Sequence, residues 1–377
     1  MAAEFGILYY LWDFAADDGR LLERVVGEVA IDHVVVPVVT GARTTFHMLV
    51  RPEAPNFHTD GGWHFRNSAK VYQNVALRPR KARWFAAGDL LAQLRERVST
   101  WNLKLHVRID LRAVQQLVDD QPHVMQRNAW GQETPAAGAC ARNADVRELL
   151  RATLEDLSRY GLAGYELRDW LPDHAVDRHT PRPYHWMPNV RRLLDMCFCA
   201  SCRQIAERAG VDGEQAARST RVYVERLLAT GDAAGADDPA ATDPVLDAYV
   251  NVRMADCAAW LRRQVEDKPE CRRLPLRDLG GPSLGTCAPW VQMLRVPPPH
   301  TIGDERWRER FDAELARSAA LSLPAWRSLF ADSAAFVSLV HRVVDGGIAV
   351  VDFEGLTEAP AEAIDWLRQA VRFARRG

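Results

Sequence analysis

Short runs of β-branched and other apolar residues alternate along the chain with longer segments in which apolar positions recur every three or four residues. The short runs predict buried strands, and the longer segments predict amphipathic helices that cover them. Strands joined by helical segments are typical of parallel sheets. The predicted strands are Phe5–Leu11, His33–Val39, Leu103–Leu111, Tyr165–Leu167, Arg272–Leu276, Val291–Val296 and Gly347–Phe353. We therefore expect an α/β fold, and within that class a (β/α)8 barrel of the TIM type.

The predicted helices follow from the same periodicity and from their end signals. The clearest one starts behind Asn143, a residue type that caps helices, and stops at Gly161. The other predicted helices span Leu21–Val29, Leu90–Val98, Arg203–Ala209, Glu214–Ala229, Val245–Val265, Glu305–Ala320, Ala325–Val344 and Pro360–Phe373. Only seven strands emerge, and Pro275 interrupts one of them. We therefore expect the barrel to be irregular or incomplete around strands five to seven.

The expected domain organisation is a single barrel over residues 1–377, with an insertion at about residues 40–87. That segment, Thr40 to Ala87, is rich in Pro, Asn, His and aromatic residues and lies between predicted strands two and three. Insertions at such a position belong to the catalytic face of a barrel. A hydrophobic content of 47% is enough to build a full core for 377 residues.

The charges of the chain give no sign of a polyanion partner. The 48 basic and 50 acidic residues are mixed and leave a formal net charge of −2. We therefore expect neither nucleic acid nor an anionic membrane as a partner. No segment approaches the ~20 apolar residues of a membrane span, and the N-terminus lacks a basic, apolar leader pattern. The expectation is a cytoplasmic protein.

Three cysteines, Cys197, Cys199 and Cys202, lie within six residues, and a fourth, Cys140, precedes them. So tight a cluster suits a tetrahedral thiolate ion such as zinc better than disulfide geometry. Four thiolates leave no open coordination position, so we expect a structural metal rather than a catalytic one. Cys140 precedes the predicted strand that carries Glu166, and the other three follow it. The metal would therefore clamp the loops around that carboxylate.

These residues resemble a known family. The segment from Cys140 to Glu148 is similar to the Cys-Pro-Asn-Ser-Pro-x-x-Arg element of family 42 glycoside hydrolases, the zinc-containing β-galactosidases, and Cys197 to Arg203 resembles their C-x-C-x-x-C element. The resemblance implies a zinc ion held by the four cysteines and a general acid/base at Glu166, and it implies trimers by analogy. The family has an Asn-Glu pair where this chain has Tyr165-Glu166, so the chain keeps the family's glutamate and lacks its asparagine. More loosely, the segment from His58 to Trp63 resembles an insertion in uncharacterised glycosidase-like bacterial barrels.

A glycosidase needs a second carboxyl group near the first. Glu354, which follows the most secure late strand, is the preferred partner of Glu166, ahead of Asp352 and Asp278. Asp110 ends the third strand and would orient either the substrate or Glu166. The alternatives are an ion pair between Glu166 and Arg168, and a capping or loop role for Glu354.

Aromatic, histidine and arginine side chains near strand ends are the expected lining of a sugar pocket, because sugar rings stack on aromatic faces. These candidates are Trp12, His58, Trp63, His64, Trp130, Arg168, Trp170, His185 and Trp186. Ordinary core packing is the alternative for the tryptophans. A second alternative is an open metal site built from Asp173, His174, Asp177 and His179.

Together these features predict a glycoside hydrolase-like enzyme that acts on a carbohydrate by carboxylate acid/base catalysis and carries a structural zinc. One alternative is a barrel that kept the zinc scaffold but performs elimination, isomerisation or metal-dependent chemistry on a sugar-derived substrate. A barrel that only binds sugar is the other.

Overall fold

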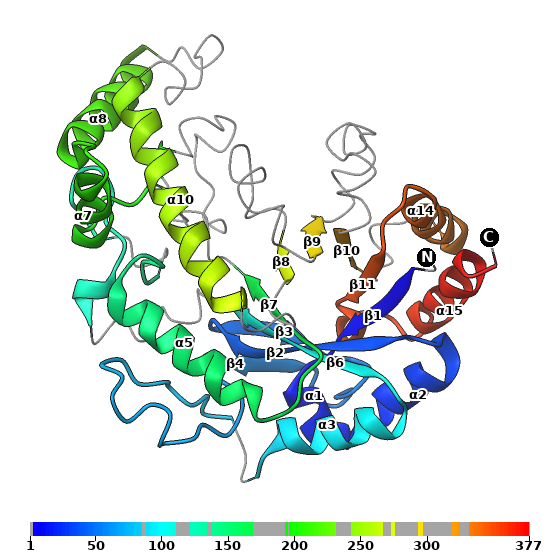
Figure 1. The fold of residues 1–377 in the computed structure, drawn as a ribbon. Helices are drawn as coiled ribbons and strands as arrows, with labels where there is room; N and C mark the ends of the chain where they lie inside the picture. The colour runs from blue at the N-terminus through cyan, green and yellow to red at the C-terminus, as the bar shows by residue number, and fades with distance from the viewer. Residues whose placement is uncertain are drawn as a thin grey trace.

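Eight parallel strands close into a barrel in the computed structural model (Figure 1). The structure describes residues 3–84, 88–110, 121–133, 138–168, 193–194, 196–230, 243–266, 273–275, 293–296, 319–324 and 332–376. In order around the barrel the strands are β1 (Glu4–Leu8), β2 (His33–Thr40), β6 (Lys104–Asp110), β7 (Gly164–Arg168), β8 (Arg273–Pro275), β9 (Met293–Val296), β10 (Ala319–Pro324) and β11 (Val350–Glu354). Parallel pairing of β1 with both β2 and β11 closes the ring. The predicted (β/α)8 fold is confirmed.

The eighth strand corrects the prediction made from the sequence. Residues 319 and 320 were expected at the end of a helix from Glu305 to Ala320, but they begin β10. The pair of alanines favours a helix locally. Parallel pairing of β10 with β9 on one side and β11 on the other overrides that preference. Residues 305–318 lie outside the described residues.

Helices pack around the barrel and along one side of it. The helices next to the strands are α1 (Leu11–Asp17), α2 (Arg20–Val29), α3 (Leu90–Thr100), α5 (Ala144–Ser158), α14 (Ser333–Asp345) and α15 (Ala363–Ala374). α14 starts eight residues later than predicted, because Asp332 caps it by accepting a hydrogen bond from the Ala335 N–H at 2.8 Å. Short 3-10 turns lie at η2 (Pro122–Val124) and η7 (Leu356–Glu358).

Three further helices, α7 (Ala200–Arg208), α8 (Gly213–Thr230) and α10 (Pro244–Glu266), pack against one another at one side (Figure 1). α7 and α8 stand away from the barrel, and α10 runs back toward it. We call these three helices, with the loop 121–133 and Cys140, the helical appendage. The appendage has an apolar cluster of its own, which includes Phe198, Ala206, Leu246 and Tyr249.

The insertion after β2 forms a small layer over one end of the barrel. Its hairpin pairs β3 (Arg43–Phe46) with β4 (Asn56–Thr59), and β5 (Gly62–Trp63) adds an antiparallel strand to the end of β2. β3 and β4 therefore lie beyond the carboxyl end of β2, which is the end where barrel enzymes bind substrates. Among the described residues, no helix is both long and apolar enough to cross a membrane.

Strand alternation separates the outside of the barrel wall from its interior. Val107 and Ile109 of β6 belong to the main hydrophobic core beneath the helices, as does Phe353 of β11. Their neighbours at alternate positions therefore face the barrel interior. Those inward positions are unusually polar, because they include His106, Arg108, Glu166, Asp352 and Glu354. The candidate site therefore lies in this polar barrel interior.

Candidate functional site

Arg108 brings the two predicted carboxylates together. From β6, its Nε lies 2.9 Å from Glu166 Oε1 on the neighbouring strand β7. Its second terminal nitrogen, Nη2, lies 2.6 Å from Glu354 Oε1 at the end of β11. Arg108 and Glu166 are only 3% and 2% exposed, whereas Glu354 is 28% exposed. One buried guanidinium thus connects the fourth and eighth strands of the barrel, and Glu354 faces solvent.

The guanidinium determines the charge of this group. A cation in direct contact favours the ionised form of each carboxyl group. One positive and two negative charges leave the triad with a net charge of −1. Glycosidases use two acids roughly 5–10 Å apart, and the Arg108 guanidinium holds Glu166 and Glu354 together as such a pair. The arrangement can supply carboxylate chemistry at the barrel mouth.

A second buried pair lies one layer deeper in the barrel. His33 Nε2 of β2 lies 2.5 Å from Asp352 Oδ1 of β11, and the ring of His106 meets the His33 ring edge-on at 5.2 Å. Gly6 of β1 makes room for the pair, because a Cβ there would lie 2.1 Å from His33 Nε2. This layer forms a polar floor beneath Arg108.

An aromatic cluster closes the mouth on the side of the insertion. Trp12, on α1, stacks on Tyr10 at 4.4 Å and on Phe57 of β4 at 5.2 Å, and it meets Trp84 edge-on at 5.7 Å. Trp12 has no exposed surface. The structure therefore places this predicted sugar-stacking residue inside the packing.

His64 and Trp63 are buried as well. His64 Nδ1 accepts a hydrogen bond from Trp84 Nε1 at 2.9 Å, and its Nε2 lies 2.7 Å from Thr40 Oγ1. Trp63 Nε1 donates to Thr153 Oγ1 of α5 at 3.2 Å, which directs the indole toward the helix layer. Neither side chain has exposed surface for a ligand in this structure.

The other predicted site residues are dispersed. Asp110 is half-buried at the end of β6, and Arg168 ends β7 beside it in the strand register. His58 is exposed on β4, with its Nδ1 3.0 Å from Thr44 Oγ1. Trp130, 38% exposed, lies in the appendage loop 121–133. The remaining candidates lie outside the described residues: Trp170, His185, Trp186, Asp278 and the alternative metal site at Asp173–His179.

Asp13 and His47 form a fully buried pair that ties the insertion to α1. His47 Nδ1 lies 2.8 Å from Asp13 Oδ1, and its Nε2 contacts Thr45 Oγ1 of β3. Burial raises the pKa of Asp13, although His47 and Thr357 of η7 act in the opposite direction. The pair therefore holds α1, β3 and η7 together around the mouth.

Two charged residues at the mouth were not among the site residues predicted from the sequence. Glu358, on η7, is half-buried, and burial raises its pKa even though the charge of Arg43 lowers it. Arg43, on β3, places its guanidinium over the Tyr10 ring at 5.3 Å from the centroid. The spacing of four residues between Glu354 and Glu358, directly after a strand, is the signal that would have revealed the second acid.

The four predicted metal ligands converge in the appendage. The sulfur atoms of Cys140, Cys197, Cys199 and Cys202 all lie within 4.8 Å of one another, and all four residues are buried. A tetrahedral site with bonds of ~2.3 Å would separate its sulfurs by about 3.8 Å. The distances from Cys140 Sγ to Cys202 Sγ and Cys197 Sγ are 3.5 and 4.0 Å. The residues fit a metal ion.

Local structure explains why these cysteines meet. Cys199 is the N-cap of α7 and Cys202 lies in its first turn, so one helix start presents both sulfurs. The N–H of Phe198, between Cys197 and Cys199, donates to the Arg127 carbonyl at 2.6 Å, and the N–H of Cys140 donates to the Val124 carbonyl at 2.8 Å. Both bonds anchor cysteine segments on the loop 121–133.

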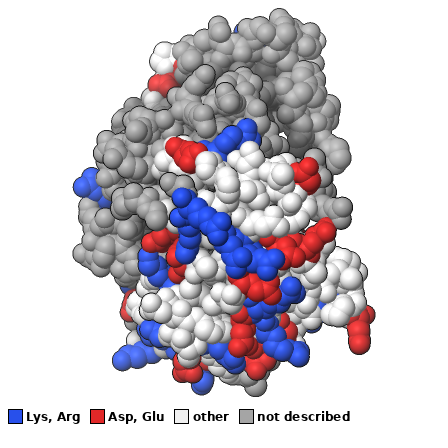
Figure 2. Space-filling model, turned by 90° about the vertical axis from the view of Figure 1, so that its right-hand side faces the viewer, with Lys and Arg blue, Asp and Glu red and all other residues white. Residues whose placement is uncertain are grey.

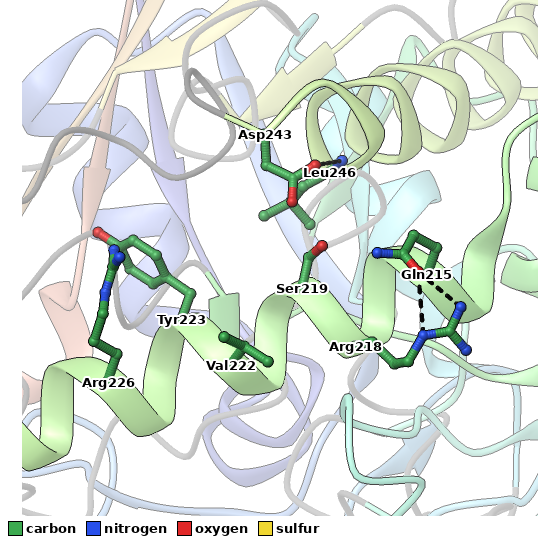
Figure 3. Close-up of a pocket in the computed structure, with 8 residues that line it drawn as sticks. All are labelled: Gln215, Arg218, Ser219, Val222, Tyr223, Arg226, Asp243 and Leu246. Carbon is green, nitrogen blue, oxygen red and sulfur yellow. Dashed lines mark hydrogen bonds between the residues drawn. The ribbon is translucent and has the colours of Figure 1, made fainter.

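A cavity of about 510 Å³ lies along α8, in the appendage (Figure 3). Gln215, Arg218 and Tyr223 line it from one face of α8, and Asp243 lines it from the start of α10. Arg218 donates to Gln215 at 2.7 Å, and Asp243 accepts from the backbone of α10. These polar groups are thus engaged with their own helices, and the cavity contains none of the barrel carboxylates.

The chain is similar to known proteins in fold and not in sequence. No family model matches the chain, and no curated protein is similar to it in sequence. Two glycosidases are among the solved structures that align over nearly its whole length. The α-L-fucosidase isoenzyme 2 from Paenibacillus thiaminolyticus has a TM-score of 0.58 at 10% identity, over 99% of this chain and 49% of that one. The β-galactosidase from the psychrophilic Marinomonas ef1 has a TM-score of 0.55 at 10% identity, over 98% and 59%.

The fold is a TIM barrel of the kind found in glycosidases. At 10% identity the likeness concerns the fold alone. The chain also spans only about half the length of the fucosidase and three fifths of the galactosidase. What the barrel does must therefore be argued from its own residues.

Proposed function

We propose that the chain is a glycoside hydrolase-like enzyme that acts on a carbohydrate at the mouth of its barrel. The observation that carries this proposal is the Arg108 bridge, which joins Glu166 and Glu354 from two distant strands. A second carboxylate next to Glu166 is what hydrolysis requires, whereas a barrel that only binds sugar does not need a paired set of acids. The bridge therefore favours hydrolysis over the sugar-binding alternative.

In this proposal Glu354 is the carboxylate that faces the substrate, as nucleophile or base, because it is the exposed member of the triad. Glu166 is the second acid: once the sugar displaces Arg108 from it, Glu166 takes up a proton from solvent and transfers that proton to the leaving group. Arg108 keeps both groups in place and ionised before the substrate binds.

Glu358 is a second candidate for the proton donor. Its raised pKa favours the protonated state that a general acid needs. Leaving groups separate the two candidates, because loss of the true acid slows glycosides with poor leaving groups more than those with good ones.

We propose that the four-cysteine cluster binds zinc as a structural ion. Its four sulfurs fill a tetrahedral shell, so this ion has no open position for a substrate. A tetrathiolate centre also needs reduced cysteines, which is consistent with a cytoplasmic location.

On the face shown in Figure 2, Lys and Arg side chains lie beside Asp and Glu rather than forming one basic surface. A neutral carbohydrate partner therefore fits better than a polyanion.

The test is hydrolysis of a panel of aryl α- and β-glycosides by the wild type and by Glu354→Gln, Glu166→Gln and Glu358→Gln. We expect Glu354→Gln to lose activity by about 10³-fold, in the range for an essential acid or base. Glu148→Gln is the matched control, because Glu148 is an exposed helical acid paired with Arg151. Wild-type rates in Glu354→Gln would contradict the proposal.

A further inference from the structure

A zinc ion bound by four thiolates carries a net charge of −2. The four cysteines lie in the apolar cluster of the appendage, which places Leu193, Met196, Phe198 and Ala206 around them. Uncompensated charge is strongly unfavourable in such surroundings unless an opposite charge lies close by. The centre therefore needs a source of positive charge within the protein.

The start of α7 supplies part of that charge. Cys199 caps this nine-residue helix, and Cys202 lies in its first turn. The N-terminus of a helix carries about half a positive charge, which favours thiolates there. Half a charge leaves most of the centre's −2 uncompensated.

Arg253, on α10, is a full positive charge that contacts the same apolar cluster through Tyr249. Its side chain is only 2% exposed, so it is among the largest fully enclosed side chains of the described residues. Its guanidinium lies 5.0 Å from the centroid of the Tyr249 ring. Tyr249 in turn stacks on Phe198 at 4.9 Å, and its hydroxyl donates to the Cys197 carbonyl at 2.9 Å. The arginine is therefore layered against the cysteine segment through one aromatic ring.

The charges agree with this geometry. A buried guanidinium is costly without negative charge nearby, and buried thiolates are costly without positive charge. A zinc tetrathiolate and the Arg253 guanidinium, which share one aromatic stack, would therefore compensate one another.

We propose that Arg253 is the buried counter-charge of the metal centre and that it links metal binding to the docking of α10. This inference rests on the proposed zinc. The Arg253 carbonyl accepts a hydrogen bond from Arg142 Nε at 3.1 Å, and Arg142 lies two residues after Cys140. One turn further along α10, Asp256 pairs with Arg147 of α5. α10 therefore connects the centre to the helix layer of the barrel.

The experiment measures zinc affinity by competition with a chromophoric chelator at one fixed pH, for the wild type and three variants. Arg253→Met removes the charge and keeps the volume, and we expect it to weaken zinc binding about 10- to 100-fold, as loss of an outer-shell partner typically does. Arg253→Lys keeps the charge and should stay within a few-fold of the wild type. Arg221→Met is the matched control: Arg221 is in the same appendage, donates to the Ala129 carbonyl and pairs with Glu214 at 3.3 Å. It should bind zinc like the wild type.

Alkylation by iodoacetamide gives a second readout on the zinc-loaded proteins. Thiolates without their counter-charge are more nucleophilic. The four metal-site cysteines should therefore be alkylated faster in Arg253→Met than in the wild type, and in Arg253→Lys they should react as slowly as in the wild type. If Arg253→Met does not fold, the comparison of Arg253→Lys with Arg253→Gln separates charge from shape in the same way.

Wild-type zinc affinity in folded Arg253→Met would overturn the role of Arg253 and leave the zinc proposal standing. An equal loss in Arg221→Met would also overturn it, because the effect would then belong to the appendage as a whole. A wild-type chain that binds no zinc would remove the metal centre itself, and the role of Arg253 with it.

Discussion

His64 shows how a single residue can be read in two ways. Its position in the insertion predicted a sugar contact, but the structure uses both ring nitrogens inside the protein, one with Trp84 and one with Thr40. Because the Trp84 indole can only donate, His64 Nδ1 accepts and Nε2 carries the proton. The side chain is thus held as a neutral imidazole.

This neutral state predicts a pH dependence of stability. Burial, with a smaller contribution from the charge of Arg43, lowers the pKa of His64 to about 3, whereas in the unfolded chain it has its ordinary value of 6.5. The unfolded state therefore gains a proton first as pH falls. The stabilisation is complete above pH 6.5 and is lost below it, by up to about 1.4 kcal/mol per pH unit.

The measurement is chemical denaturation of the wild type and His64→Gln between about pH 7.5 and 5, a range that spans the ordinary histidine pKa. The difference in unfolding free energy between them should shrink as pH falls below 6.5. His58→Gln is the control, since His58 is exposed on β4 and should leave the wild-type profile unchanged. A difference that stays constant over this range would show that His64 is not held neutral.

Arg108 marks the limit of what the sequence reveals about single residues. Glu166, Glu354 and the four cysteines could be proposed because carboxylates at strand ends and a C-x-C-x-x-C spacing are local signals. Arg108 lies inside a strand, and one of its partners is 246 residues away. Its role depends on barrel closure, which brings β6, β7 and β11 around one interior, and no local pattern contains that information.

Among the elements, strands with strong β-branched composition were predicted well and β10 was not. β2 consists mostly of valine, and its predicted span, His33–Val39, ends one residue before the observed one. β10 has the sequence Ala-Ala-Leu-Ser-Leu-Pro, which contains no β-branched residue. It is a strand because β9 and β11 pair with it on both sides. Tertiary pairing decides such a segment, so composition alone could not.

The start of α14 allows a test whose sign separates the predicted from the observed boundary. If the helix began at Ala325, Asp332 would lie inside it, and Asp332→Ala would stabilise the protein through better helix propensity. Since Asp332 caps the helix instead, the substitution should cost about 1 kcal/mol. Ser338→Ala, within α14, is the control and should be neutral or slightly stabilising. Thermal unfolding of the three proteins would show which sign holds.

At the scale of the whole molecule, the described residues form a large apolar core in the barrel and a smaller, separate cluster in the appendage, and the two differ in what holds them together. The barrel core is large and continuous, and it joins residues from β1 to α15. The appendage cluster is small, and four of its members are the cysteines. A single barrel domain was expected from the sequence. No periodic pattern predicted a second cluster, because the appendage cluster assembles from segments that flank β7 on both sides.

This division predicts that removing the metal opens the appendage and spares the barrel. Structural zinc contributes roughly 10–16 kcal/mol to the folding of small thiolate sites, which is more than the small appendage cluster can replace. After chelation, hydrogen exchange should become fast in α7 and in the first half of α10, while β6 and α5 keep their protection. Cys199→Ser should reproduce this pattern without a chelator.

Cys257→Ser is the control, since Cys257 is a buried α10 cysteine of the barrel core and lies outside the metal cluster. This variant should retain zinc and appendage protection even if it weakens the barrel. Uniform loss of protection on chelation would mean that the two clusters fold as one unit, and the metal would then support the carboxylate site directly rather than through α10.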